Sequence, residues 1–182
     1  GSWNGRLMEG VYTIKAEKDK YYSKSKQIQV EAGEENNLDF ELKGKTGSTD
    51  VITTPMNAKV FVNRQKKGTT PTTLKDLIVG TYSLKLEKEG YASIKKDIEI
   101  KENQTTEVNK KLTKGKKVTI TSRPKGAEVS VDGEIIGKTP NTITLDFKRH
   151  KIKLVKGNRT VQKTIDVSKV EEDYFPFDVS EK

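Results

Sequence analysis

Few residues in this 182-residue chain could carry out catalysis or bind a transition metal, because it has one histidine and no cysteine. The histidine, His150, stands in the basic run from Lys148 to Lys151, which predicts a solvated surface turn rather than a site for acid–base chemistry. A chain without cysteine has no disulfide bonds and no thiolate metal site. Nucleophilic and transition-metal chemistry therefore have almost no side chains to use.

Carboxylates are the remaining candidates for catalysis, because two acids about 5 to 10 Å apart can hydrolyse a glycosidic bond. The densest acidic clusters are Glu34-Glu35 and Glu171-Glu172-Asp173. Both fall in predicted turns, so a solvated loop is the simplest interpretation. A weak calcium site is the alternative, although neither cluster has the spaced oxygen ligands of a calcium loop. We expect no catalytic, cofactor-binding or metal-binding residues and interpret the chain as not an enzyme.

Aromatic side chains offer a different kind of site. Tyr12 and Tyr82 fall on predicted inward positions and are expected in the core. The residues that we consider for an interaction surface are Trp3, Tyr22, Phe61, Phe175 and Phe177, with His150 from the basic turn. Each of these aromatic residues abuts a core position of opposite phase. Contacts between neighbouring units are the more economical use of them, and exposed anchors for a glycan or a protein are the alternative.

The charge is strongly positive, at +9 formally, and only five of the 35 basic residues are arginine. Lysine is a hydrated point charge, whereas recognition of phosphate or guanine favours the planar fork of arginine. We interpret the charge first as a solvated, self-repelling surface, and second as attraction to an acidic glycan, to peptidoglycan or to an anionic membrane. Nucleic acid is not an expected partner. No apolar run approaches the roughly 18 residues of a transmembrane segment.

An internal sequence repeat defines the structural units that position the candidate residues. Segments 51–62 and 120–131 align without a gap, and Pro55 and Pro71 recur 69 residues later as Pro124 and Pro140. A further copy appears at an offset of 70 residues, where Gly10, Tyr12, Lys18, Tyr21, Ile28 and Leu42 match Gly80, Tyr82, Lys88, Tyr91, Ile98 and Leu112. A repeat at this period indicates a tandem array of small units.

Apolar and polar residues alternate within each repeat, which is the pattern of half-buried strands. After the inward Val129 and Val131, Asp132-Gly133 predicts a tight two-residue hairpin, because both central residues of such a turn need positive φ. The equivalent Asn63-Arg64 keeps only the asparagine and predicts a longer loop that runs to Gly68. No segment has helical periodicity. We therefore predict an all-β fold, with sandwiches of about six or seven short strands.

Lysine and glycine collect in segments 43–49 and 114–117, which predict short linkers. They divide the chain into a partial repeat over 1–44, a complete repeat over 45–114 and a complete but divergent repeat over 115–182. The partial repeat has no counterpart to the hairpin of 51–68, so one edge of its sheet should lack a partner. We expect a neighbouring unit or another molecule to cover this edge.

Several short motifs recur in a fixed order: Pro124-Lys125-Gly126-Ala127, Val129, Val131-Asp132-Gly133, Gly137-Lys138-Thr139-Pro140, Gly80-Thr81-Tyr82 and Glu89-Gly90-Tyr91. This order resembles the PEGA domain, which is named for a Pro-Glu-Gly-Ala core. The resemblance covers two full repeats and the rear of another. It implies a tandem array of small immunoglobulin-like or transthyretin-like β-sandwiches from exported bacterial or archaeal proteins. It brings no established ligand, cofactor or catalytic residue.

The sequence departs from the family pattern at several positions. Lys125 and Met56 stand where the pattern has glutamate, and Asn57 stands where it has glycine. The third repeat lacks the Gly-x-Tyr and Gly-Tyr motifs, and His150 and Val161 lie near their positions. We therefore expect irregular later loops in the third repeat.

These observations favour a non-catalytic structural and interaction role. We expect a stalk of β-sandwiches in an exported or cell-envelope bacterial protein, periplasmic or extracellular, that spaces or presents other domains of its parent protein. The alternative is a module that binds a glycan or peptidoglycan through lysines and exposed aromatic residues. Because the first residues already match the middle of a repeat, we expect the chain to be part of a longer protein with any export signal upstream.

Overall fold

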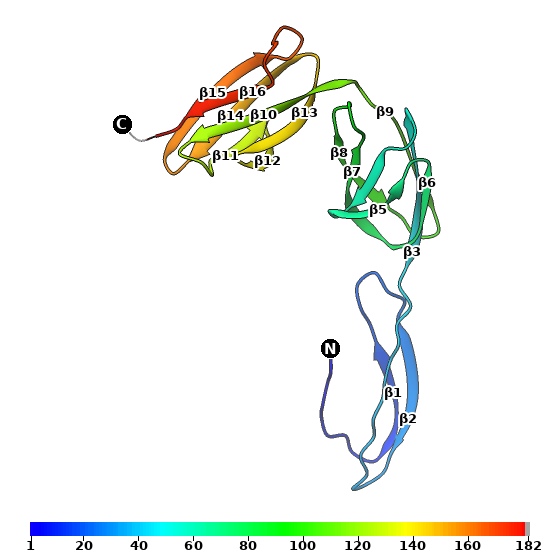
Figure 1. Cartoon of the computed structure of the whole chain (residues 1–182). Helices are drawn as coiled ribbons and strands as arrows, with labels where there is room; N and C mark the ends of the chain where they lie inside the picture. Colours follow the sequence, from blue (N-terminus) through cyan, green and yellow to red (C-terminus); the bar gives the residue numbers. More distant parts are fainter. Residues whose placement is uncertain (181–182) are drawn as a thin grey trace. The chain divides into compact units, whose positions relative to one another are not determined.

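The computed structural model describes residues 1–180, and all the regular secondary structure in this range is β-strand (Figure 1). The prediction of an all-β tandem array of small β-sandwiches is confirmed. In the described range the structure has no helix of the length and apolar character needed to cross a membrane. Short alternating runs of valine, isoleucine and threonine account for the all-β structure, because such residues fit a half-buried pleated surface.

The third repeat contains seven strands: β10 (Gly115–Arg123), β11 (Glu128–Val131), β12 (Glu134–Lys138), β13 (Asn141–Asp146), β14 (Arg149–Lys156), β15 (Arg159–Asp166) and β16 (Tyr174–Asp178). They form a three-stranded sheet in the order β13-β10-β16 and a four-stranded sheet in the order β12-β11-β14-β15. Buried side chains from both sheets make one apolar cluster, in which Ile120, Val129, Ile152 and Leu154 are fully enclosed. The third repeat is therefore a β-sandwich with its own core (Figure 1).

The second repeat also contains seven strands: β3 (Thr46–Thr54), β4 (Lys59–Val62), β5 (Gln65–Thr69), β6 (Thr72–Ile78), β7 (Gly80–Glu87), β8 (Ile94–Ile100) and β9 (Thr105–Lys111). One sheet has the order β6-β3-β9 and the other has the order β5-β4-β7-β8. This strand order matches that of the third repeat position by position. Some strands and connections differ in length between the two repeats, but the same alternation of apolar residues builds the same topology twice.

The first repeat has only two strands, β1 (Gly10–Ala16) and β2 (Lys24–Val30), which pair as an antiparallel hairpin. Their sheet has no third strand within residues 1–180. We expected a neighbouring unit or another molecule to cover the free edge. Within residues 1–180, no strand of the second or third repeat pairs with β1 or β2, and what covers this edge stays a prediction.

The turn between β4 and β5 corrects one prediction. The expected longer loop is absent, because β4 ends at Val62 and β5 begins at Gln65, as in the third repeat. Asn63 and Arg64 adopt φ angles of 48° and 69°, and Asp132 and Gly133 adopt 52° and 89°. The Asn63 side chain accepts a hydrogen bond from the Ser83 N–H at 3.0 Å, which supports the left-handed backbone at this turn.

A buried hydroxyl pair accompanies the paired prolines. The bonds before Pro55, Pro71, Pro124 and Pro140 are all cis. In the third repeat the hydroxyl oxygens of Ser122 and Thr139 lie 2.6 Å apart, and the Ala127 N–H donates to the Thr139 hydroxyl at 3.0 Å. The second repeat has the equivalent contacts. The hydroxyl oxygens of Thr53 and Thr70 lie 2.5 Å apart, and the Ala58 N–H donates to the Thr70 hydroxyl at 3.0 Å. In the second and third repeats, a threonine hydroxyl thus accepts a hydrogen bond from the equivalent buried alanine N–H.

Contacts divide the chain into two compact units. The first unit holds Gly1–Asp50, Thr73–Thr81 and Glu99–Glu107, and the second holds Val51–Thr72, Tyr82–Ile98 and the chain from Val108 onward. The strands of the second repeat are shared between both units. The division therefore differs from the repeat boundaries at 1–44, 45–114 and 115–182, which stay a prediction.

Candidate functional site

The loop that follows β1 is held in place by backbone hydrogen bonds to the following linker. Tyr21 pairs with Gly44 in an antiparallel bridge. On either side of this bridge, the Tyr22 N–H donates to the Lys43 carbonyl at 2.9 Å, and the Lys45 N–H donates to the Lys20 carbonyl at 2.9 Å. Lysine and glycine predicted a short linker here, and the structure ties that linker to the loop of the preceding repeat.

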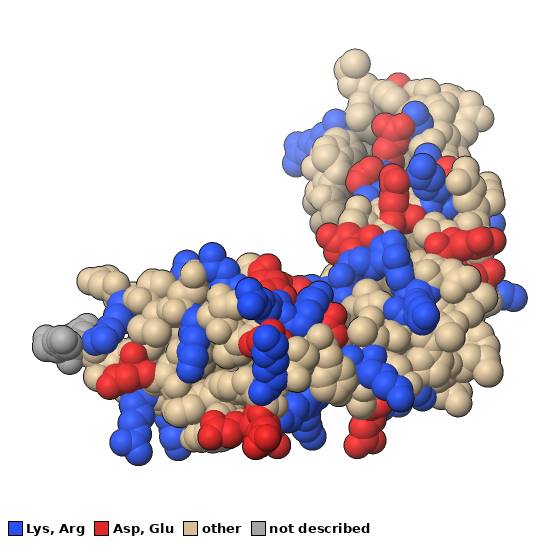
Figure 2. Space-filling view, turned by 90° about the horizontal axis from the view of Figure 1, so that it is seen from above, with Lys and Arg blue, Asp and Glu red and all other residues tan. Residues whose placement is uncertain are grey.

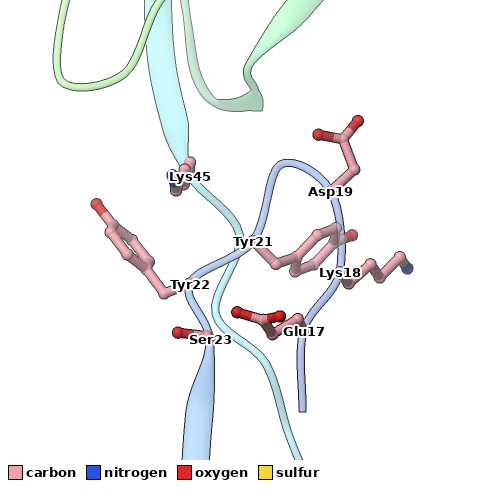
Figure 3. A pocket seen from close by; sticks show the side chains of 7 residues that line it. All are labelled: Glu17, Lys18, Asp19, Tyr21, Tyr22, Ser23 and Lys45. Carbon is pink, nitrogen blue, oxygen red and sulfur yellow. The ribbon is translucent and has the colours of Figure 1, made fainter. Parts of the chain in front are cut away.

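An open hollow of about 480 Å³ lies between this loop and the linker. Its lining residues are Glu17, Lys18, Asp19, Tyr21, Tyr22, Ser23 and Lys45. Tyr21 and Tyr22 point away from the backbone in opposite directions, as neighbours in extended chain do (Figure 3). Two tyrosine rings, two lysines and two acids therefore meet at one place on the first unit.

Cations and aromatic rings pair within this hollow. The Lys18 ammonium lies 4.4 Å from the centre of the Tyr21 ring, and the Lys45 ammonium lies 5.6 Å from the centre of the Tyr22 ring. The Tyr22 hydroxyl donates to the carboxylate of Glu102. This hydrogen bond, helped by burial and by the negative charge of Glu102, raises the pKa of Tyr22 above its usual value. The hollow therefore presents two tyrosine rings, each with one ammonium group beside it.

The same arrangement of loop and linker occurs after β7. Tyr91 pairs with Lys114 in an antiparallel bridge, as Tyr21 pairs with Gly44. The Ala92 N–H donates to the Thr113 carbonyl at 2.9 Å, and the Gly115 N–H donates to the Gly90 carbonyl at 3.0 Å. The two loops differ at one position of the repeat, where the loop after β1 has Tyr22 and the loop after β7 has Ala92. The phenol that reaches Glu102 is therefore particular to the first loop.

His150 was predicted to be a solvated residue, and the structure shows that this interpretation is wrong. Only 4% of its surface is exposed, and it lies in β14 rather than in a turn. The strand pairing explains the burial: β4 places Val62 opposite Leu84, and β11 places Val131 opposite Ile152. His150 therefore occupies the inward position that Tyr82 has in the second repeat. Continuing the repeat alignment through the segment that lacks the Gly-x-Tyr motif would have predicted that His150 is buried.

Two acids surround the buried imidazole. Nδ1 of His150 lies 2.8 Å from Oδ2 of Asp132, and Nε2 lies 3.0 Å from the Asp146 carbonyl oxygen and 2.7 Å from its Oδ1. Both ring nitrogens thus face acceptor oxygens. Burial raises the pKa of Asp132, but hydrogen bonds from the Lys151 N–H and from His150 outweigh it, so the pKa lies below its usual value. This cluster ties the turn after β11 to β14.

The other sequence candidates for an interaction surface are not brought together. Trp3 is 74% exposed, and Tyr22 is 40% exposed in the hollow. Phe61 is half-buried in β4. Phe175 and Phe177 are buried in the core of the third repeat, so an exposed anchor at either position is contradicted. Their strand β16 alternates buried and exposed residues, and Tyr174 is its exposed aromatic residue.

The surface charge is dispersed on the face that Figure 2 shows, where acidic side chains lie between the lysine and arginine side chains. Acidic and basic side chains also form ion pairs, such as Lys95 with Glu134 at 2.6 Å and Lys148 with Asp146 at 3.1 Å. Within residues 1–180, no three histidine or acidic side chains gather closely enough to hold a metal ion. Paired, dispersed lysines fit the interpretation of a solvated surface.

Comparison with known proteins gives the family. A Bacillus anthracis protein, described as the TIE protein, has a solved structure that is similar with 19% sequence identity and a TM-score of 0.42. The similarity covers 97% of this chain and 42% of that one, so the chain spans less than half the length of that protein. No curated protein matches the chain. The family model of the PEGA domain matches residues 46–116 and again residues 115–177. Since the two matches together span more than half of the sequence, the chain belongs to the PEGA domain family.

Proposed function

We propose that the chain is a non-catalytic structural and interaction module of an exported or cell-envelope protein, in which it spaces or presents other domains. The observation that carries this proposal is the repeated tie between loop and linker. Tyr21 with Gly44, and Tyr91 with Lys114, form equivalent bridges in which the linker backbone is hydrogen-bonded to the preceding loop. A linker held in this way suits a spacer better than a free coil does.

The repeated residues support the same proposal. The features common to the second and third repeats are core and turn residues, such as Ala58 with Ala127 and Thr70 with Thr139. These residues enclose apolar side chains or satisfy backbone donors. Selection for a stable module explains them without a ligand.

Small-angle scattering of the full chain tests this function. A compact single domain of 182 residues has a radius of gyration of about 16 Å. A spacer built of tandem modules should give a clearly larger value that does not change with protein concentration. A radius near that of the compact domain would contradict the proposal.

We infer a second candidate function from the hollow of the first unit. Its two tyrosine rings and two lysines offer the stacking surfaces and cations that an acidic glycan or peptidoglycan would need. Retention on an immobilised acidic polysaccharide at about 0.15 M salt is the test, because weak unspecific attraction is screened there. The variant Tyr22→Ala should lose retention, and the exposed β15 variant Lys163→Ala should keep it. Equal retention of both variants, or no retention of the chain, would contradict this function.

A further inference from the structure

We propose that the loop between β15 and β16, residues 167–173, forms a binding site for a primary ammonium group, and that the side chain of Lys116 fills this site. The filled site sets the conformation of the loop and the point at which β16 begins. This inference is independent of the proposed spacing and glycan-binding functions, because the site lies inside the third repeat.

Three backbone carbonyl groups of this loop converge on one side-chain nitrogen. Nζ of Lys116, in β10, donates to the carbonyl oxygen of Glu171 at 2.5 Å. It also donates to the carbonyl oxygens of Val170 at 3.0 Å and Glu172 at 3.2 Å. An ammonium group has three N–H donors, so these three acceptors match it in number. The contacts are to the backbone and not to the carboxylates of the acidic cluster 171–173, so they depend on the path of the loop.

A hydrogen-bonded turn precedes these carbonyls. The Asp166 carbonyl accepts from the N–H groups of Lys169 at 3.0 Å and Val170 at 3.2 Å. The Asp166 carboxylate accepts from the Ser168 N–H at 3.2 Å. A lysine side chain can hydrogen-bond the carbonyls at the end of such a turn. The turn does not continue as a helix, and Lys116 supplies the donors that further helical N–H groups would provide.

The second repeat has a glycine where the third repeat has this lysine. Gly47 and Lys116 are equivalent by the repeat offset, since 116 − 47 = 69. A Cβ added at Gly47 would lie 2.2 Å from the Lys101 carbonyl oxygen and 2.9 Å from that of Gln104. The backbone of the turn between β8 and β9 therefore occupies the space that a lysine side chain would need. A lysine at this position requires a different path for the connection that follows the eighth and fifteenth strands.

This connection has the same length in both repeats but a different conformation. It runs over residues 100–108 in the second repeat and over residues 167–175 in the third, and the residues at both ends are buried. β9 begins at Thr105, whereas β16 begins at Tyr174, which corresponds to position 107 (174 − 67 = 107). Glu172 corresponds to the first residue of β9 (172 − 67 = 105), but it lies outside β16 and its carbonyl oxygen binds the ammonium. The exchange of glycine for lysine on the central strand accounts for this difference.

The filled site lies next to the place where β16 joins its sheet. β16 pairs with β10 in parallel, with Thr119 opposite Tyr174, and the Thr119 N–H donates to the Asp173 carbonyl at 2.6 Å. Lys116 lies on the same strand, three residues before Thr119. Parallel strands need a crossover connection, so the loop determines where β16 enters the sheet. Lys116 therefore positions the strand that carries Phe175 into the core.

Amide exchange of the full chain, followed by nuclear magnetic resonance, tests this inference with the variant Lys116→Met, which keeps an unbranched stem and removes the charge and all three donors. The N–H groups of Val170 and Thr119 form backbone hydrogen bonds at the two ends of the loop. Their exchange should become at least about tenfold faster, because the loop loses three hydrogen bonds from a charged donor. The control is Lys117→Met, at the exposed neighbouring position, which should leave both rates unchanged.

A small amine added to Lys116→Ala tests the site itself. Propylammonium contains the atoms that this variant lacks, and at about 0.1 M it should restore slow exchange at Val170. Tetramethylammonium at the same concentration gives equal screening but has no N–H donor, so it should restore nothing. The comparison also decides the question if loss of the lysine unfolds the third repeat, because recovery of the folded amide signals is then the readout.

Three results would overturn the inference. Wild-type exchange at Val170 and Thr119 in Lys116→Met would show that the ammonium does not hold the loop. Equally fast exchange in Lys117→Met would show that any loss of positive charge on β10 has this effect. No restoration by propylammonium, or equal restoration by both salts, would show that the loop has no site for a primary ammonium group.

Discussion

At the residue scale, the side chains that matter most are buried polar groups that accept hydrogen bonds from backbone N–H groups. Thr139 is 5% exposed, and its hydroxyl accepts hydrogen bonds from the N–H groups of Gly126 and Ala127 at 3.1 Å and 3.0 Å. A buried donor without a partner costs free energy. The alternation pattern identified the inward Val129 and Val131 of β11, but it did not show that a hydroxyl pair would lie beside the turn before this strand.

The variant Thr139→Val keeps the shape of the side chain and removes the hydroxyl. We expect it to lower the free energy of unfolding of the third repeat by about 1 to 3 kcal/mol, because the buried Ala127 N–H loses its acceptor. Urea titration followed through the amide signals of β14 would measure the change. Thr164→Val, at an exposed position of β15, is the control and should change stability by less than about 0.5 kcal/mol. Equal effects of both variants would show that the hydroxyl contacts contribute nothing.

The second residue-scale prediction concerns pH. The pKa of Asp132 lies below its ordinary value of 3.8 in the folded chain, mainly because Lys151 N–H and His150 hydrogen bonds outweigh the opposing effect of burial. A carboxyl group whose pKa is lowered in the folded state stabilises the fold at pH values above its ordinary pKa. This stability is lost as the pH falls through the pKa of the folded state. We expect thermal unfolding of the chain to lose stability below about pH 4, with a smaller loss in Asp132→Asn. An identical acid profile for the variant would contradict the coupling of Asp132 to His150 and Lys151.

At the element scale, pairing partners decide which segments become strands. Residues 35–41 keep the alternation of β9, yet they form no strand in the first repeat. The all-β fold, the count of about six or seven strands and the equivalence of β4 with β11 followed from the period and alternation of the sequence. The alternation of apolar residues indicates which face of a segment is apolar, but it does not show whether a neighbouring strand is present to pair with it.

Three other features could not be predicted from the sequence, for similar reasons. Asn63-Arg64 turned out to form a two-residue hairpin, because the strand ladder and the Asn63 side chain hold an arginine at positive φ. His150 turned out to be buried, because register along β14 outweighs the basic residues around it. Charge patterns report the solvated face of a strand, and a single residue on the other face is easily missed. The hydrogen bond from Tyr22 to Glu102 joins residues that are distant in the sequence, so no local pattern predicts it.

The start of β3 provides an element-scale prediction. Gly47 lies so close to the turn between β8 and β9 that an added Cβ would be 2.2 Å from the Lys101 carbonyl oxygen and 2.9 Å from that of Gln104. Gly47→Ala should therefore lower the free energy of unfolding by about 1 to 3 kcal/mol, as overpacking does. Urea titration followed by the amide signals of β3 and β9 would measure it. The control is Gly5→Ala, where the added Cβ would meet only the ring of exposed Trp3. Wild-type stability in Gly47→Ala would contradict the close approach.

At the scale of the whole molecule, the account is one of repeated modules that are joined through hydrogen-bonded linkers. The family matches at 46–116 and 115–177 place a PEGA domain in the second and third repeats. The first 45 residues lie outside both matches, so their assignment as a partial repeat stays a prediction. Equivalent bridges after β1 and β7 hold the linker at the end of the first repeat and the linker at the end of the second repeat to their preceding loops.

Amide hydrogen exchange at the linkers tests the central claim most directly. The N–H groups of Tyr22 and Lys45 donate to Lys43 and Lys20, and those of Ala92 and Gly115 donate to Thr113 and Gly90. If linkers are held to the preceding loops, all four amides should exchange at least about tenfold more slowly than the amides of the exposed, non-strand residues 2–4. Exchange of the four amides as fast as that of residues 2–4 would contradict the account.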